Sequence, residues 1–362
     1  MARASDAARV RHIGEVNMWE VNNQTPFAAA CNWVLDKNAA KSWVIAVKAT
    51  FDILPDGSTQ VADQQEDALF GEIYAGEAGK TSILYDGDLG GSKQRTDVVL
   101  NGFAYAPPDR RVTETTVALK VGRIAKTLKV FGDRRWERGV VGLAMTSPAP
   151  FERIPIVYER AFGGWDRTSP DPADQRLEPR NPIGVGFAVR EAHLLHSLVP
   201  NVEDPRYPIS TWKDRPPPAG FGVIASHWMP RLKYAGTYDA TWQKERSPLL
   251  AADFDPRFFQ CAPEDQQTTL RGDETVELIN LSPGGRLVFS LPRVWLGFQT
   301  RFGEQRIDHR SSLHTVILEP ATPRVIMVWH TILPVPNRDV DYLDETIVFE
   351  KDAIEVQAAG ER

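Results

Sequence analysis

Residues 43–53 read WVIAVKATFDI, and this stretch predicts the kind of fold that the chain adopts. Its apolar side chains alternate with Lys48, Thr50 and Asp52, a period of two that is typical of a strand with one buried face. The turn signal PDG follows at residues 55–57, since glycine adopts a positive φ without a steric penalty. We therefore expect a half-buried β-strand that ends in a tight turn.

The same alternation recurs towards both ends of the chain. Residues 115–121 and 124–131 flank Gly122-Arg123, and glycine at the first position of a two-residue loop favours a type II′ hairpin. Further strands are expected at 277–281, 286–291, 294–302, 313–318, 324–333 and 345–350, with PGG at 283–285 as a hairpin turn. The stretch at 324–333, RVIMVWHTIL, echoes 43–53. Internal duplication and shared strand composition both remain open as explanations.

The middle of the chain has a different composition. Thirteen of the 27 prolines fall within residues 148–218, where each removes a backbone donor and interrupts a ladder or a helix. The same region is too rich in aromatic residues for a linker, so it predicts an ordered layer of loops. Short helices are expected at 191–198 and at 240–246, the second capped by Thr237 or Asp239.

These patterns predict a mainly β protein of antiparallel, sandwich-like sheets with long, ordered, proline- and aromatic-rich loops and a few short helices. The expected organisation is a flexible extension (1–17), a β region (18–147), a loop-rich insertion (148–270), a second β region packing on the first (271–350) and a flexible tail (351–362).

Charge and composition restrict the classes of partner. The net charge of −6 argues against a general nucleic-acid binder, although the 42 Lys and Arg leave a local basic patch open. Residues 1–14 lack the apolar core of a secretion signal, and no stretch approaches the roughly 20 apolar residues that span a bilayer. We therefore expect a cytoplasmic protein without membrane insertion. Two cysteines, Cys31 and Cys261, favour reduced apolar side chains over disulfides or a Cys-rich zinc site.

The motifs that suggest chemistry are incomplete. The segment GEAGKT at 76–81 lacks the first glycine of a phosphate-binding loop, which favours a turn. His193 and His196 have helical ligand spacing but no third ligand at a recognised spacing. Asp253 and Asp255 are candidate carboxylates for glycoside hydrolysis, although their i, i+2 spacing before proline favours a turn. We expect no enzymatic activity, no catalytic residue, no metal and no cofactor.

Several segments of the chain are distinctive as an ordered set: NQTPF (23–27), VKATF (47–51), DVVLNG (97–102), LKVFGDR (128–134), YERAFGG (158–164), PRNPIGVGF (179–187), LVPNVEDP (198–205), RPPPAGFG (215–222), AGTYD (235–239) and ADFDPRFFQ (252–260). From about residue 18 to about residue 333, this set resembles the bacterial family catalogued as domain of unknown function 2169. The resemblance implies a cytoplasmic adaptor-chaperone of type VI secretion. Such a protein stabilises a toxic effector and helps load it onto the spike through PAAR or VgrG proteins. The family has no established catalytic residues to transfer.

The leading hypothesis is therefore protein binding through aromatic and arginine side chains of the loops, since Trp, Tyr and Arg dominate interface hot spots. The candidate contact residues are Arg160, Phe162, Trp165, Arg180, Arg257 and Phe258. The alternative for each of them is a structural role within the loops. Two other functions stay open at this point, a carbohydrate-binding β-sandwich and a hydrolase that uses Asp253 and Asp255.

Overall fold

The alternating stretch that opens the sequence forms β3 (Lys41–Ile53), the longest strand of a seven-stranded sheet. The structure is a computed structural model that describes residues 19–351. The expected extension (1–17) and, apart from Lys351, the expected tail (351–362) lie outside the described residues. The strand order of this central sheet is β2 (Ala28–Leu35), β3, β26 (Arg324–Pro334), β25 (Ser312–Glu319), β7 (Thr96–Leu100) and β20 (Gln267–Thr268), with β4 (Thr59–Val61) on β3.

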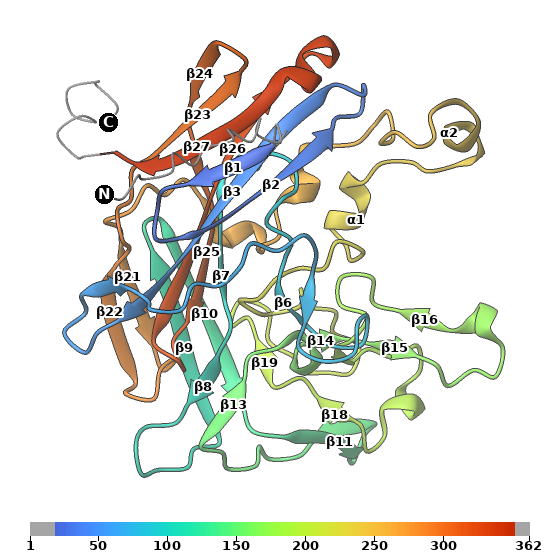
Figure 1. The fold of residues 1–362 in the computed structure, drawn as a ribbon. Coiled ribbons are helices and arrows are strands. Elements are labelled where there is room, and N and C mark those ends of the chain that lie inside the picture. Colours follow the sequence, from blue (N-terminus) through green and yellow to red (C-terminus); the bar gives the residue numbers. More distant parts are fainter. Residues whose placement is uncertain (1–18, 352–362) are drawn as a thin grey trace, which may run out of the picture.

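Two further sheets complete a β-sandwich, and the mainly β, mostly antiparallel fold is confirmed. One has the order β1 (Glu20–Asn23), β27 (Leu343–Glu350), β23 (Leu296–Phe302) and β24 (Gln305–His309). The other has the order β19 (Val202–Glu203), β10 (Ile124–Phe131), β9 (Glu114–Val121), β21 (Thr275–Ile279) and β22 (Arg286–Ser290). One apolar cluster joins all three sheets, and Figure 1 shows their strands gathered on one side of the molecule.

The predicted strands and hairpins lie where their local patterns placed them. β9 and β10 pair through Val121 and Ile124, and Gly122 has a φ of 54°, as the first position of a type II′ turn requires. β21 and β22 form the second predicted hairpin. The two similar stretches are neighbours in the central sheet, where β3 and β26 run antiparallel with Lys48 opposite Val328.

The expectation of a half-buried β3 is wrong, because its second face is covered as well. Lys48 is only 2% exposed, and its ammonium lies 3.0 Å from the carboxylate of Asp88. Thr50, also on this face, is buried and accepts a hydrogen bond from the backbone N–H of Glu66. Polar side chains on β3 therefore meet protein rather than water.

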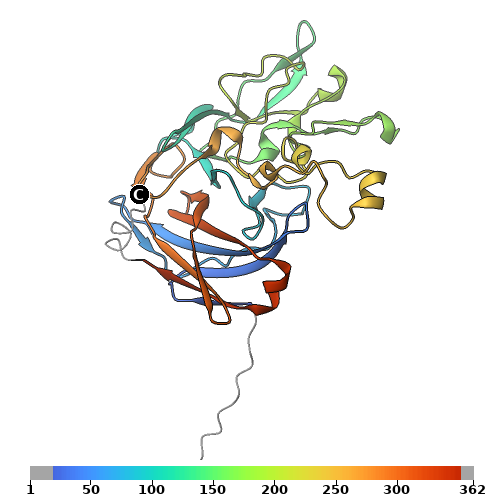
Figure 2. The ribbon, with the colours of Figure 1, turned by 90° about the horizontal axis from the view of Figure 1, so that it is seen from above.

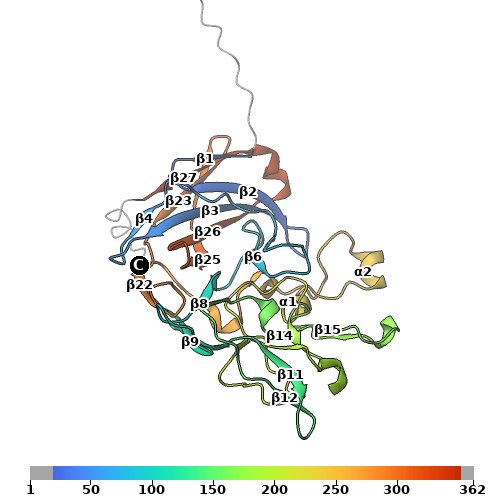
Figure 3. The same cartoon turned by 90° about the horizontal axis from the view of Figure 1, so that it is seen from below.

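The cover of this second face consists of residues 62–95 together with the loop layer, which we define as residues 148–270. Val99, Ile317 and Ile326 of the central sheet pack there against Tyr158 and Trp228. Figures 2 and 3 show the sandwich on one side and the loops on the other, with α2 (Ala240–Glu245) and the β15–β16 hairpin projecting outward.

Short elements stabilise these loops. The strands are β5 (Ile73–Tyr74), β6 (Ile83–Tyr85), β8 (Phe103–Tyr105), β11 (Arg134–Arg138), β12 (Leu143–Met145), β13 (Arg153–Pro155), β14 (Phe162–Gly163), β15 (Trp165–Asp166), β16 (Arg176–Leu177), β17 (Val185–Gly186) and β18 (Leu198–Val199). Helix α2 is confirmed, and Asp239 caps it by accepting the backbone N–H of Trp242 at 2.8 Å. The helix expected at 191–198 is only one 3-10 turn, η3 (Glu191–Leu194), because the chain reverses at His196 with a φ of 67° and enters β18.

Candidate functional site: a pocket in the loop layer

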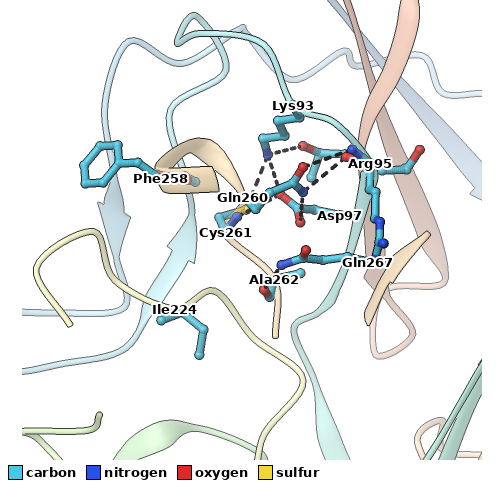
Figure 4. A network of polar contacts seen from close by, with 12 residues as sticks. Lys93, Arg95, Asp97, Ile224, Phe258, Gln260, Cys261, Ala262 and Gln267 are labelled. Carbon is cyan, nitrogen blue, oxygen red and sulfur yellow. Dashed lines mark hydrogen bonds and ion pairs between the residues drawn. The ribbon is translucent and has the colours of Figure 1, made fainter. Parts of the chain in front are cut away.

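A buried polar network attaches the loop layer to the central sheet. Asp97 on β7 is fully buried, and its carboxylate accepts hydrogen bonds from the Gln260 amide and the Cys261 backbone N–H, each at 2.8 Å. The ammonium of Lys93 lies 2.7 Å from the same carboxylate and donates to the Thr315 hydroxyl at 2.9 Å. Figure 4 shows these side chains converging between β7 and the 260–262 segment. One carboxylate therefore determines the position of that segment.

Two groups of this network, Lys93 and Cys261, have shifted pKa values. Burial by itself lowers the pKa of Lys93, but Asp97, Cys261 and Asp86 together outweigh it and raise that pKa above its ordinary value. Burial raises the pKa of the Cys261 thiol well above its usual range, and Asp97 adds to the effect. Lys93 is thus a permanent cation and Cys261 a neutral thiol. This environment opposes the thiolate that nucleophilic chemistry requires.

The outer side of the same segment forms part of a pocket of about 250 Å³, which we call the loop-layer pocket. Gln260 and Ala262 contribute to its wall. The remaining apolar surface comes from prolines and from side chains around α1 (Arg231–Tyr234): Pro217, Pro218, Ile224, Met229, Pro230, Tyr234 and Pro263. Since proline has a fixed φ, these walls lose little conformational entropy when a ligand binds.

Two of the predicted contact residues, Arg180 and Arg257, meet at this pocket. The guanidinium of Arg180 donates twice to Glu178, at 2.7 and 2.8 Å. Arg257 donates to Asp255 in the same way and stacks on the Tyr234 ring at 4.4 Å. Each hydrogen-bonded carboxylate raises the pKa of its arginine, and Arg257 remains 56% exposed. Both cations are therefore held in one orientation, with donors left for a ligand.

The other four predicted contact residues lie elsewhere. Trp165 is 45% exposed on β15, with Arg167 stacked on its ring at 4.0 Å. Arg160 forms an ion pair with Asp133 and a hydrogen bond with Asn201, both at 3.0 Å, and so fixes the loop.

The two phenylalanines lie inside the loops. Phe162 is 3% exposed and packs in a small core with Trp136 and Leu194, so it does not belong to an exposed binding surface. Phe258 is half-buried, with its ring 5.7 Å from that of Phe254. Of the six candidates, Trp165 and Arg257 are the most exposed, Arg160, Arg180 and Phe258 are partly exposed, and Phe162 is buried.

One residue that organises the pocket was missed by the sequence analysis. Arg231 is buried, pairs with Asp86 at 2.9 Å and donates to the carbonyls of Ile224 and Phe258 at 2.7 and 3.0 Å. It joins both sides of the pocket wall to the 86–95 segment. No spacing in the sequence marks it, because its partners come from three separate segments. The sequence shows the proline run at 216–218, but it does not show that Pro217 and Pro218 form part of the wall of this pocket.

The residues of the incomplete chemical motifs have structural roles in the fold. The turn expected at 76–81 is confirmed between β5 and β6. His193 Nδ1 lies 2.8 Å from Asp166, and within residues 19–351 no group of three His, Cys, Asp or Glu side chains is arranged to hold a metal ion. Asp253 accepts the backbone N–H and the hydroxyl of Thr237, and these bonds lower its pKa.

Asp255 has a comparable role at the start of the following 3-10 turn. It caps η4 (Pro256–Phe259) by accepting the backbone N–H of Arg257 at 2.9 Å, and the hydrogen bonds from Arg257 lower its pKa. These are the contacts that the turn interpretation predicts for Asp253 and Asp255.

Comparison with known proteins identifies the family. No curated protein and no solved structure matches this chain. In the described part of the chain, none of the helices has the length and apolar character needed to cross a membrane. A family model does match residues 38–330, which include most of the central sheet, the loop layer and the loop-layer pocket. The chain therefore belongs to the bacterial family described as "Uncharacterized protein conserved in bacteria (DUF2169)".

Proposed function

We propose that this protein is a cytoplasmic adaptor that binds and stabilises a type VI secretion effector and helps load it onto the spike, through a PAAR-like or VgrG component. The family resemblance implies this role. The observation that supports it best is the loop-layer pocket, in which a rigid apolar wall lies beside two oriented arginines. A pocket of this kind accepts an apolar side chain of a partner together with a neighbouring acidic group.

Preorganisation is the physical argument for binding. A protein interface loses affinity when side chains and loops must be ordered on association. Here Glu178 and Asp255 already orient the arginines, and the Asp97 network already holds the 260–262 segment. Most of the conformational entropy of these side chains is therefore lost during folding and not on binding.

Exposed apolar side chains on projecting segments extend the proposed surface. Trp165 lies on the β15–β16 hairpin, and the exposed Tyr238 packs edge-to-face on the half-buried Trp242 of α2, with ring centroids 4.7 Å apart. Val140 and Val141 occupy the fully exposed turn between β11 and β12. Figure 3 shows these segments projecting away from the sandwich. Apolar side chains in such positions are typical of interaction surfaces.

Co-expression tests the proposal. The chain is produced with the large protein encoded beside it, and both the amount of soluble partner and the recovered complex are measured. We expect the partner to accumulate only in the presence of the chain. Arg180→Glu combined with Arg257→Glu is expected to weaken the complex about 30-fold or more, the effect of losing one hot spot of about 2 kcal/mol. Trp165→Ala tests the projecting hairpin.

Matched controls come from the sandwich. Arg338→Glu and Tyr342→Ala change exposed residues of η6 (Asn337–Tyr342) and are expected to leave the complex intact. Thermal unfolding of each variant shows whether the fold is retained. A partner that is equally soluble alone and forms no complex contradicts the proposal. Specific binding on a glycan array would instead favour the carbohydrate-binding hypothesis.

A further inference from the structure

A second cavity, of about 330 Å³, opens at one end of the sandwich, where β7, β23 and β25 begin and β27 ends. Five cationic residues line it, and we call it the basic cleft: Lys93, Arg95, Arg271, Arg310 and Lys351. They come from separate segments of the chain, so only the fold brings them together. Their common sign contrasts with the net charge of −6 of the whole chain.

The basic cleft has no acidic lining residue in the part of the chain that the structure describes. The acids closest in sequence to Arg95 and Arg271 are already paired, and one of them, Asp97, neutralises Lys93 of the cleft itself. Asp97 pairs with Lys93 at 2.7 Å, and Asp273 pairs with Arg293 at 2.8 Å. Glu274 accepts the backbone N–H groups of Arg271 and Gly272 at 2.8 and 2.9 Å. The positive charge of Arg95 and Arg271 is therefore directed at the cleft and its solvent.

Arg95 is held at its backbone and extends its side chain towards solvent. The Gln260 amide bonds both its N–H, at 3.0 Å, and its carbonyl, at 3.2 Å. Figure 4 shows its side chain leading away from the Asp97 network. Both Arg95 and Arg271 are exposed, so a ligand in the cleft can reach their guanidinium groups.

Apolar surface lies beside the cations. Trp295, just before β23, is half-buried, and Leu296, Leu313 and Trp329 line the cleft with 7%, 7% and 4% of their surface exposed. A bare inorganic anion would leave this surface in contact with water. The volume is in the range of specific ligand clefts and exceeds what a single ion needs. The cleft thus combines charge recognition with a site for an apolar group.

We propose that the basic cleft binds an acidic peptide segment of another protein, in which carboxylates flank a leucine or an aromatic residue. The carboxylates pair with Arg95 and Arg271, because the planar guanidinium matches a carboxylate with two parallel hydrogen bonds. The apolar side chain covers the tryptophan and leucine surface. A nucleic acid fits less well, since this is a concave site on an acidic protein rather than an extended basic stripe.

Fluorescence anisotropy with the full chain tests this assignment. The probe is a short fluorescein-labelled peptide of alternating Glu and Leu. We expect binding that weakens as salt increases and that is lost when Gln replaces Glu, or Ser replaces Leu, in the peptide. Arg95→Glu and Arg271→Glu are each expected to weaken binding about tenfold or more, as loss of a charge-assisted contact implies. Arg138→Glu, an exposed change on β11, is the matched control.

Three results would overturn the proposal. Unchanged affinity in both cleft variants, with the fold intact by circular dichroism, removes the cleft as the site. Equal binding of the Gln peptide removes carboxylate recognition. Tight binding of tripolyphosphate or single-stranded DNA without binding of the Glu–Leu peptide assigns the cleft to phosphates. The test does not use the effector complex, so its failure leaves the loop-layer pocket as a separate question.

Discussion

At the scale of single residues, Asp97 connects the two halves of the molecule. Its carboxylate has three donors: Lys93, in the segment just before β7, and Gln260 and Cys261 of the loop layer. Removing one partner of a buried ion pair leaves an uncompensated charge, which costs about 3–5 kcal/mol. We predict that Asp97→Ala lowers the free energy of unfolding by about that amount, measured by urea titration.

The matched control is Asp273→Ala, because Asp273 pairs with Arg293 at the surface with 61% of its side chain exposed. Exposed pairs contribute at most about 1 kcal/mol. Equal destabilisation by the two substitutions would contradict the role assigned to Asp97.

At the scale of secondary-structure elements, a β-bulge in β25 prepares the sheet for the loop layer. The register with β26 shifts between Leu313 and Thr315, so His314 is an extra residue. His314 stacks on His330 of β26 with ring centroids 4.0 Å apart, while the next residue, Thr315, accepts the hydrogen bond from Lys93. The consecutive side chains of His314 and Thr315 therefore face the same side of the sheet, which residues 62–95 and the loop layer cover. Simple alternation at 313–318 does not reveal this arrangement.

The histidine pair predicts how stability depends on pH. Burial lowers the pKa of His330 to about 3 and that of His314 well below its ordinary value, and burial lowers the pKa of His309 on β24 to about 4. As pH falls below about 6.5, the unfolded chain binds protons that the folded chain does not, so folding stability decreases. We predict a loss of about 1.4 kcal/mol per pH unit for each histidine between about pH 6 and pH 5, measured by urea unfolding.

Substitution distinguishes this pair from general acid effects. His330→Gln should reduce the slope of the unfolding free energy against pH by the contribution of one histidine, whatever its effect on stability at neutral pH. His227→Gln, which changes an exposed histidine of the loop layer, should leave the slope unchanged. If both variants retain the slope of the unmodified chain, the buried histidines are not its origin.

At the scale of the whole molecule, the sandwich and the loop layer share buried surface on the central sheet. Val99, Ile317 and Ile326 are buried beneath the loop layer and residues 62–95. An interface this apolar favours unfolding in a single transition. We predict one calorimetric peak whose van't Hoff and calorimetric enthalpies agree. Replacing residues 148–265 by a short flexible linker should give an insoluble or dye-binding chain, whereas two separable transitions would show that the parts fold independently.

The sequence by itself determined the longer alternating strands such as β3 and β26, the two hairpins and the turn at Gly122-Arg123, because period-two alternation and glycine φ preferences are local properties. It also identified Arg180 and Arg257 as candidate contacts. Only the tertiary structure decided that these two arginines share one pocket, that Phe162 is buried and that Lys48 faces protein. The basic cleft likewise exists only in the folded chain. The physical reason is that burial and convergence depend on pairings between distant segments, and local periodicity does not specify which segments cover a sheet.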